Sequence, residues 1–146
     1  MIRPICKDTV LLSQPAADAS NADLQIAADL RDTLQANAHR CVGMAANMIG
    51  IPKRIIAVLL PGTQMSIVML NPRILASSGE YETEEGCLSL PGTRRTKRFR
   101  VITVRWLNMA MQPQKRRFEG YAAQIIQHEL DHCAGILIWH KLQHEK

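Results

Sequence analysis

Long apolar runs are absent from this chain of 146 residues, which contains no stretch of 18 or more apolar residues. Spanning a bilayer as a helix takes about 20 such residues, so we expect no membrane span. The N-terminal stretch MIRPICKDTVLLSQ also lacks what a secretory signal needs, because Pro4 and Asp8 interrupt the apolar core and no small-residue cleavage site follows. We therefore expect a cytoplasmic protein without membrane partners.

Cysteine is scarce as well. Four cysteines are too few for a disulfide scaffold and suit a reducing compartment, where one of them is a candidate metal ligand. The chain is 47% hydrophobic and 21% charged, as is usual for soluble globular proteins, and its length can bury a core without disulfides. We expect one domain over residues 1–146.

The net charge of +5 comes with two groups of basic residues, Arg94, Arg95, Lys97, Arg98 and Arg100, then Lys115, Arg116 and Arg117. Such a patch would suit a polyanion, and ribosomal RNA is the obvious candidate. A solvated loop and edge strand explain the same residues at least as well. Both interpretations stay open at the level of sequence.

The segment at residues 121–135 carries the strongest chemical pattern. His128 and His132 are four residues apart, about 400° around a helix, so both imidazoles leave one face and can close on one ion. Glu129 completes H-E-x-x-H, in which the Glu handles the protons of metal-bound water. A surface helix could carry this set by accident, but apolar neighbours predict burial: Ile125, Ile126, Leu130 and Cys133.

A catalytic metal usually has three protein ligands and one open position, so a third ligand is needed. Cys133 follows His132 directly and points about 100° away from it on a helix, which excludes it from sharing the ion. Cys87 is the better candidate. It lies between Gly86 and a predicted turn at residues 91–92, at the end of a strand. A cysteine thiol beside a divalent cation loses its proton and can then coordinate the cation as a thiolate.

Periodicity predicts the remaining elements. Ser20 and Asp23 form a capping box before an amphipathic helix at residues 22–38. Residues 1–20 show no period and are expected to be extended chain and turns. Strands are predicted at 54–60, 66–72, 80–84, 101–107 and 114–118, and a short strand or turn at 136–142. This order indicates an α+β domain of mostly antiparallel strands packed around a central metal-bearing helix.

Residues 41–50, CVGMAANMIG, are small and glycine-rich. Small side chains let a backbone approach its neighbour closely. A tight packing loop and a substrate-contacting loop are equally compatible with this composition.

Three motifs together resemble the peptide deformylase family: EGCLS at residues 85–89, QHELDH at 127–132 and the glycine–alanine stretch at 42–50. Their order and approximate spacing match over nearly the whole chain. The resemblance implies a cytoplasmic hydrolase that removes the N-formyl group from formyl-methionine on newly made polypeptides by metal-activated water. Its partners would be N-formylmethionyl peptides and nascent chains, with the ribosome nearby through the basic patch.

The resemblance also implies a metal site. Its ligands would be Cys87, His128 and His132, holding one divalent ion. Fe²⁺ is the ion expected in the cell, with Ni²⁺ or Co²⁺ active in its place and Zn²⁺ also expected in isolated protein. Glu129 would be the general base and acid.

For the substrate, the resemblance implies that the backbone N–H of Leu88 and a side-chain amide closing the first motif bind the developing oxyanion. Backbone groups of Val42 and Gly43 would pair with the extended peptide. The amide position is Met48 here, and methionine has no hydrogen bond to donate. Cys41 likewise replaces the first glycine of the motif. Low activity is therefore expected.

Further departures concern the C-terminal part, where residues 133–135 read Cys-Ala-Gly instead of the common Leu-Asp-Gly. The resemblance implies the shorter type of the family, for which no long C-terminal helix is expected. Two alternatives remain: a weakened deformylase-like protein that binds metal or formylated peptides, and a zinc peptidase whose third ligand is His140 or His144.

Overall fold

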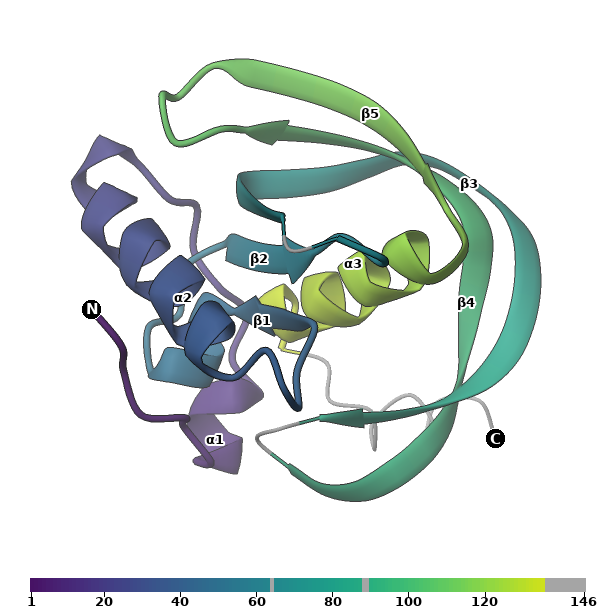
Figure 1. The fold of residues 1–146 in the computed structure, drawn as a ribbon, viewed down its shortest axis with the longest axis horizontal. Coiled ribbons are helices and arrows are strands. Elements are labelled where there is room, and N and C mark those ends of the chain that lie inside the picture. Colours follow the sequence, from purple (N-terminus) through teal and green to yellow (C-terminus); the bar gives the residue numbers. More distant parts are fainter. Residues whose placement is uncertain (64, 88–89, 136–146) are drawn as a thin grey trace.

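A computed structural model describes residues 1–63, 65–87 and 90–135, with the backbone alone at residues 87, 90, 91 and 94 (Figure 1). Three helices, two 3₁₀ turns and five strands follow one another along it. Their bounds are α1 Thr9–Leu12, η1 Asn21–Asp23, α2 Leu24–Ala36, β1 Gly43–Ala45, η2 Ala46–Ile49, β2 Ile55–Leu59, β3 Ser66–Cys87, β4 Leu90–Leu107, β5 Pro113–Glu119 and α3 Gly120–Cys133.

The strands form one antiparallel sheet in the order β1-β2-β3-β4-β5, so each strand pairs with the next along the chain. β3 and β4 are long and bend around α3, which lies at the centre of the molecule with strands on several sides (Figure 1). The predicted α+β class with mostly antiparallel strands around this helix is confirmed.

Two apolar clusters hold these layers together. One joins α2 to β1 and β2, through residues such as Leu30, Leu34 and Ile55. The other joins α3 to the concave face of the sheet, where Ile126 packs with residues such as Ile102. Alternate residues of β4 point inward, as a pleated strand with one buried face requires: Ile102, Val104 and Trp106.

Two predicted strands, 66–72 and 80–84, are parts of the single strand β3, and 101–107 is the end of β4. The intervening residues 73–79 are exposed, and the apolar residues Ile74, Leu75 and Ala76 follow one another there, so the segment shows no apolar alternation by which a strand is recognised. The turn predicted at residues 91–92 is wrong, because β4 begins at Leu90 and includes them. β3 therefore reaches Cys87 as the first half of a long hairpin.

The N-terminal region contains one helix that the sequence did not indicate, α1. The Asp8 carboxylate caps it by accepting hydrogen bonds from the backbone N–H groups of Val10 and Leu11. The capping box of Ser20 and Asp23 is confirmed, although it begins a 3₁₀ turn and α2 proper starts at Leu24. The final segment, residues 136–142, lies outside the described residues. No helix within the described part of the chain is long and apolar enough to cross a membrane.

Candidate active site

Helix α3 brings the predicted histidines and glutamate together on its buried face. Ligand atoms of His128, Glu129 and His132 all lie within 4.8 Å of one another. The two imidazole rings meet edge to face, with centroids 5.1 Å apart. Burial follows from the position of α3 between β1 and the long hairpin.

The Glu129 carboxylate is only 4% exposed, and no donor in the described part of the chain reaches its Oε1. Burial raises the pKa of Glu129 to about 7, against a weaker opposing effect of His128. Leaving a buried carboxylate oxygen without a donor is costly in an ordinary core. A carboxyl group with such a pKa can take up and release a proton near neutral pH, as a general base and acid must.

His132 is almost completely buried, and this burial lowers its pKa to about 3. The imidazole is therefore neutral at physiological pH, which is the form that coordinates metals. The end of α3 that carries it is held by Asn47, whose Nδ2 donates to the His132 carbonyl oxygen at 2.7 Å.

His128 is held by Glu85 at the end of β3, with 2.8 Å between His128 Nδ1 and Glu85 Oε1. Burial raises the pKa of Glu85, but hydrogen bonds from His128 and Arg98 outweigh it and lower that pKa to about 2. An ionised carboxylate on Nδ1 favours the tautomer that leaves Nε2 for a metal. Arg98 completes the arrangement through both its Nε and Nη2, at 2.9 and 2.6 Å from Glu85, and its Nη1 reaches Asp131 at 2.7 Å.

Glu85 and Arg98 are the positioning residues that sequence reasoning missed. Arg98 was counted in the basic patch, and this assignment is wrong, because the side chain is 2% exposed and fully paired. Across the β3–β4 hairpin Glu85 lies opposite Arg94 and Arg98 lies opposite Tyr81, so the two side chains meet diagonally and only the register of the hairpin brings them together. The sequence signal that could have indicated Glu85 as a positioning residue was its place two residues before Cys87, the candidate ligand.

A cavity of about 620 Å³ opens above these groups. Its lining includes five of the predicted site residues: Val42, Gly43, Met48, His128 and Glu129. Gly43 also packs tightly on α3, since a Cβ there would lie 2.7 Å from Ile125 Cγ2 and 2.9 Å from Glu129 Oε2. The small-residue segment thus combines both functions that its composition allowed, close packing and lining a cavity.

Met48 is buried, and its sulfur accepts the backbone N–H of Ala45 at 3.5 Å. The neighbouring amide of Asn47 is directed to α3, and Asn47 does not line the cavity within the described residues. Neither side chain of this pair is thus seen to donate a hydrogen bond into the cavity.

The remaining predicted residues are described only in part. The backbone of Cys87 ends β3, directly after Gly86, which lines the cavity. The Cys87 side chain lies outside the described residues, as do Leu88, His140 and His144. Cys133 packs in the apolar cluster between α3 and the sheet, and burial raises the pKa of its thiol to about 12. A thiol so protonated agrees with its exclusion as a ligand.

The donor set fits a divalent metal ion. Two buried imidazoles at i and i+4 converge, one is oriented by a carboxylate, and a glutamate carboxylate with a free oxygen lies next to them. The chemistry available to such a site is hydrolysis assisted by a Lewis acid.

Comparison with known proteins agrees with this chemistry. The sequence model of the polypeptide deformylase family matches residues 2–146. A peptide deformylase of Clostridium beijerinckii is 48% identical over 138 residues, which are 94% of this chain and 100% of that protein.

Solved structures of peptide deformylases superpose on this chain over nearly their whole length. The class I type b peptide deformylase of Acinetobacter baumannii, in a crystal structure with Met-Ala-Ser bound, superposes with a TM-score of 0.84 at 33% identity, over 95% of this chain and 98% of that one. The peptide deformylase of Thermotoga maritima gives a TM-score of 0.85 at 28% identity, over 97% of each chain. The chain therefore belongs to the family of peptide deformylases, metal-dependent enzymes that remove the N-formyl group from newly made polypeptides.

Proposed function

We propose that this chain performs deformylation with Glu129 as its general base and acid and with Cys87, His128 and His132 as metal ligands. The observation that carries the proposal is the convergence of His128, Glu129 and His132, of which His128 and Glu129 line the cavity of about 620 Å³. When bound, a divalent cation supplies Lewis acidity, lowering the pKa of water and polarising the formyl oxygen.

Glu129 does the proton transfers. Its carboxylate takes a proton from water as the water oxygen attacks the formyl carbon. The carboxyl group then gives that proton to the departing nitrogen as the C–N bond breaks. The second proton of the water passes from the tetrahedral intermediate to the amine, so the products are formate and a protonated N-terminal amine, and atoms and charge balance. A pKa raised by burial suits both steps, because the group must change protonation twice in each turnover.

His128 and His132 orient the site rather than move protons. Glu85 and Arg98 hold the His128 ring, and the backbone contact from Asn47 holds the helix end that carries His132. Fixed imidazoles present their nitrogens at a constant angle, which preorganises the reaction and reduces the rearrangement needed in each turnover. Fe²⁺ is our proposal for the ion in the cell.

The substrate is proposed to lie in the cavity as an extended formyl-methionyl peptide. Among the described residues β1 pairs with β2 only and lies at the edge of the sheet, so its other edge can accept an added strand. Val42 and Gly43 contribute backbone groups there, and the related Acinetobacter baumannii enzyme has been crystallised with Met-Ala-Ser. The oxyanion donor assigned by the family resemblance, the N–H of Leu88, lies outside the described residues.

One second function is favoured by a specific residue. Met48 offers no donor for the oxyanion, which supports a weakened enzyme that binds metal or formylated peptides and turns over slowly. In either case we propose that residues 1–146 act as one catalytic domain. Action in the cytoplasm beside the ribosome follows from the substrate, the nascent chain.

Metal content and turnover measured side by side test the proposal. After anaerobic reconstitution with iron, Glu129→Ala should keep its metal and lose about 10²-fold or more in turnover of formyl-Met-Ala-Ser, because a proton-transfer group is gone and the ligands remain. Cys87→Ala should instead lose stoichiometric metal, because two histidines rarely retain a divalent cation against buffer.

Two variants serve as controls. Glu82→Ala removes an exposed carboxylate of the same hairpin, and Cys133→Ala removes a buried thiol, so both should keep metal and turnover near those of the parent. Parent-like hydrolysis by Glu129→Ala would make Glu129 a structural residue. Full metal occupancy in Cys87→Ala protein would refute the ligand assignment.

A further inference from the structure

The structure separates the two basic groups of the sequence, and three cations of the first are paired within the fold. Residues 94–99 of β4 lie opposite residues 80–85 of β3, four of which are glutamates. Arg95 pairs with Glu82 at 2.7 Å and Lys97 with Glu80 at 3.7 Å, while Arg98 is buried against Glu85. These three side chains therefore offer little uncompensated charge to a partner.

A different set of cations is aligned at the other end of the sheet. Arg73 of β3 lies opposite Arg105 of β4, and Arg105 lies opposite Lys115 of β5. Directly opposite residues share one face of a sheet with Cβ atoms about 4.5–5.5 Å apart. These three residues, called the basic ladder below, form a straight row across three strands. All three are exposed, on the opposite face from the buried side chains of Val104 and Trp106.

The charges of the basic ladder are poorly compensated. In the part of the chain that the structure describes, no carboxylate lies within 4 Å of the charged groups of Arg105 or Lys115, and Arg73 has Asp18 alone, at 2.9 Å. Like charges directly opposite one another in a sheet are destabilising. The row thus carries an electrostatic cost that a bound anion would offset.

A concave surface adjoins this row. A cavity of about 390 Å³ is bordered by Arg73 and Arg105, with further lining from Asp18, Asn71, Trp106, Leu107 and Pro113. It shares no lining residue with the cavity above Glu129. The basic ladder is therefore separate from the active site, and changes in it leave the residues proposed for catalysis untouched.

We infer that the basic ladder binds the phosphodiester backbone of single-stranded RNA. A row of three cations matches a linear polyanion, whereas one small anion would leave part of the row unpaired. A flat anionic bilayer would also have to cover Asp18 and the exposed Glu119 on β5, whereas a single strand needs to contact only the narrow row itself. This inference gives the proposed encounter with nascent chains at the ribosome a defined surface, and its biological meaning rests on that proposal.

Salt-dependent RNA binding tests the inference. Fluorescence anisotropy of a fluorescein-labelled oligouridylate, titrated at several salt concentrations, would compare the parent with Arg105→Gln/Lys115→Gln. Each lost phosphate contact lowers the slope of log K against log salt by about 0.7 for single strands, so the double variant should lose about 1.4. The matched control Arg95→Gln/Lys97→Gln removes the same net charge from exposed positions of the same sheet and should retain the parent slope.

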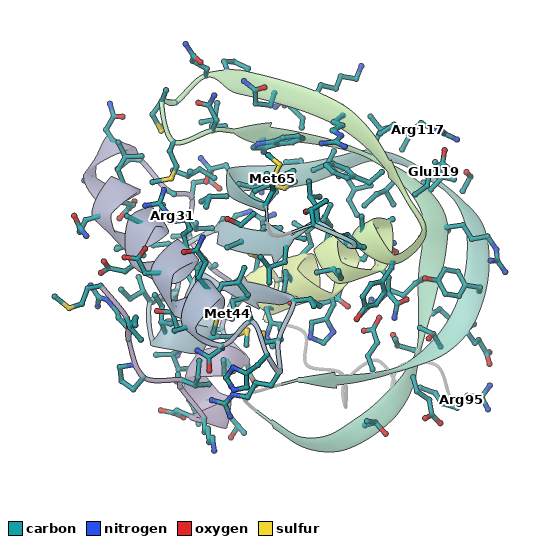
Figure 2. All side chains as sticks on the ribbon, in the orientation of Figure 1. Arg31, Met44, Met65, Arg95, Arg117 and Glu119 are labelled. Atoms are coloured by element: carbon teal, nitrogen blue, oxygen red, sulfur yellow. The ribbon has the colours of Figure 1, made fainter. Side chains whose placement is uncertain are left out.

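Figure 2 shows the control residue Arg95 projecting from the long hairpin, well away from Arg117, which lies on β5 two residues beyond Lys115. Equal losses of salt slope in both double variants would overturn the inference, because net charge would then be the cause. Failure of the parent to bind RNA at low salt would also overturn it. Binding of anionic vesicles through Arg105 and Lys115 without binding of RNA would overturn it too. Turnover of formyl-Met-Ala-Ser, measured on the same proteins, tests the proposed deformylation separately and should be the same in all three.

Discussion

Met48 is the residue of the candidate site that departs most sharply from the family pattern. Its sulfur accepts the N–H of Ala45, and a thioether has no hydrogen to donate. The adjacent Asn47 could donate, but its amide nitrogen is used on the carbonyl of His132. In the proposed mechanism, negative charge developing on the formyl oxygen therefore has one donor fewer than the family resemblance implies.

Met48→Gln should raise kcat for a formyl-Met peptide, by up to about 10² to 10³, which is what one preorganised oxyanion donor contributes. Metal content should change little. The control is Met48→Leu, which keeps an apolar side chain of similar size without a donor and should match the parent. A parent that is already fast, and that Met48→Gln slows, would show that another donor serves the oxyanion.

Between elements, the decisive contact is that of β1 with α3. A glycine at position 43 lets the strand backbone lie against the helix at the point where Glu129 projects. Any larger residue would have to displace Ile125 or the Glu129 carboxylate. The strand edge proposed for the peptide and the proposed base are thus set at a constant separation.

Gly43→Ala should therefore lower both stability and turnover, since overpacking of this kind costs about 1–3 kcal/mol and the new Cβ is directed at Glu129 Oε2. Thermal unfolding and kcat measured on one preparation would check it. Gly86→Ala is the control for stability: its new Cβ meets nothing closer than 3.5 Å, so its melting temperature should stay near that of the parent. An unchanged kcat in Gly43→Ala would mean that the β1–α3 spacing does not govern the position of Glu129.

At the scale of the whole molecule, the N-terminal residues Met1 and Arg3 pack against helix α2. The Asp29 carboxylate accepts from the amino group of Met1 at 3.0 Å and from Arg3 Nε at 2.8 Å. Further along, the N–H of Cys6 reaches the Met48 carbonyl oxygen at 2.6 Å. The N-terminal segment therefore links α2 to the turn that follows β1, beside the active site.

This link should make the free energy of unfolding depend on pH in the acid range. Hydrogen bonds from the Met1 amino group and Gln25 lower the pKa of Asp29 from 3.8 to about 2. A carboxylate whose pKa is lower in the folded state stabilises the fold above its unfolded pKa, and this contribution is lost as pH falls through the folded value. Urea unfolding of the parent should therefore show stability declining between about pH 4 and pH 2, with a smaller decline in Asp29→Asn. Identical profiles for the two proteins would contradict this assignment.

Local patterns in the sequence determined the helical features of the candidate site and of the N-terminal half. The spacing of His128 and His132 gave their shared helical face, apolar neighbours gave its burial, and Ser20 with Asp23 gave the cap near α2. These predictions hold because helix geometry and capping depend on residues a few positions apart.

The tertiary structure decided what depends on strand pairing. Register across the β3–β4 hairpin turned Arg98 from a surface charge into the buried partner of Glu85, and it aligned Arg73, Arg105 and Lys115 into one row. The approach of β1 to α3 gave Gly43 its role. Such contacts join residues far apart in the chain, and a shift of one residue in register would put every side chain of a strand on the other face.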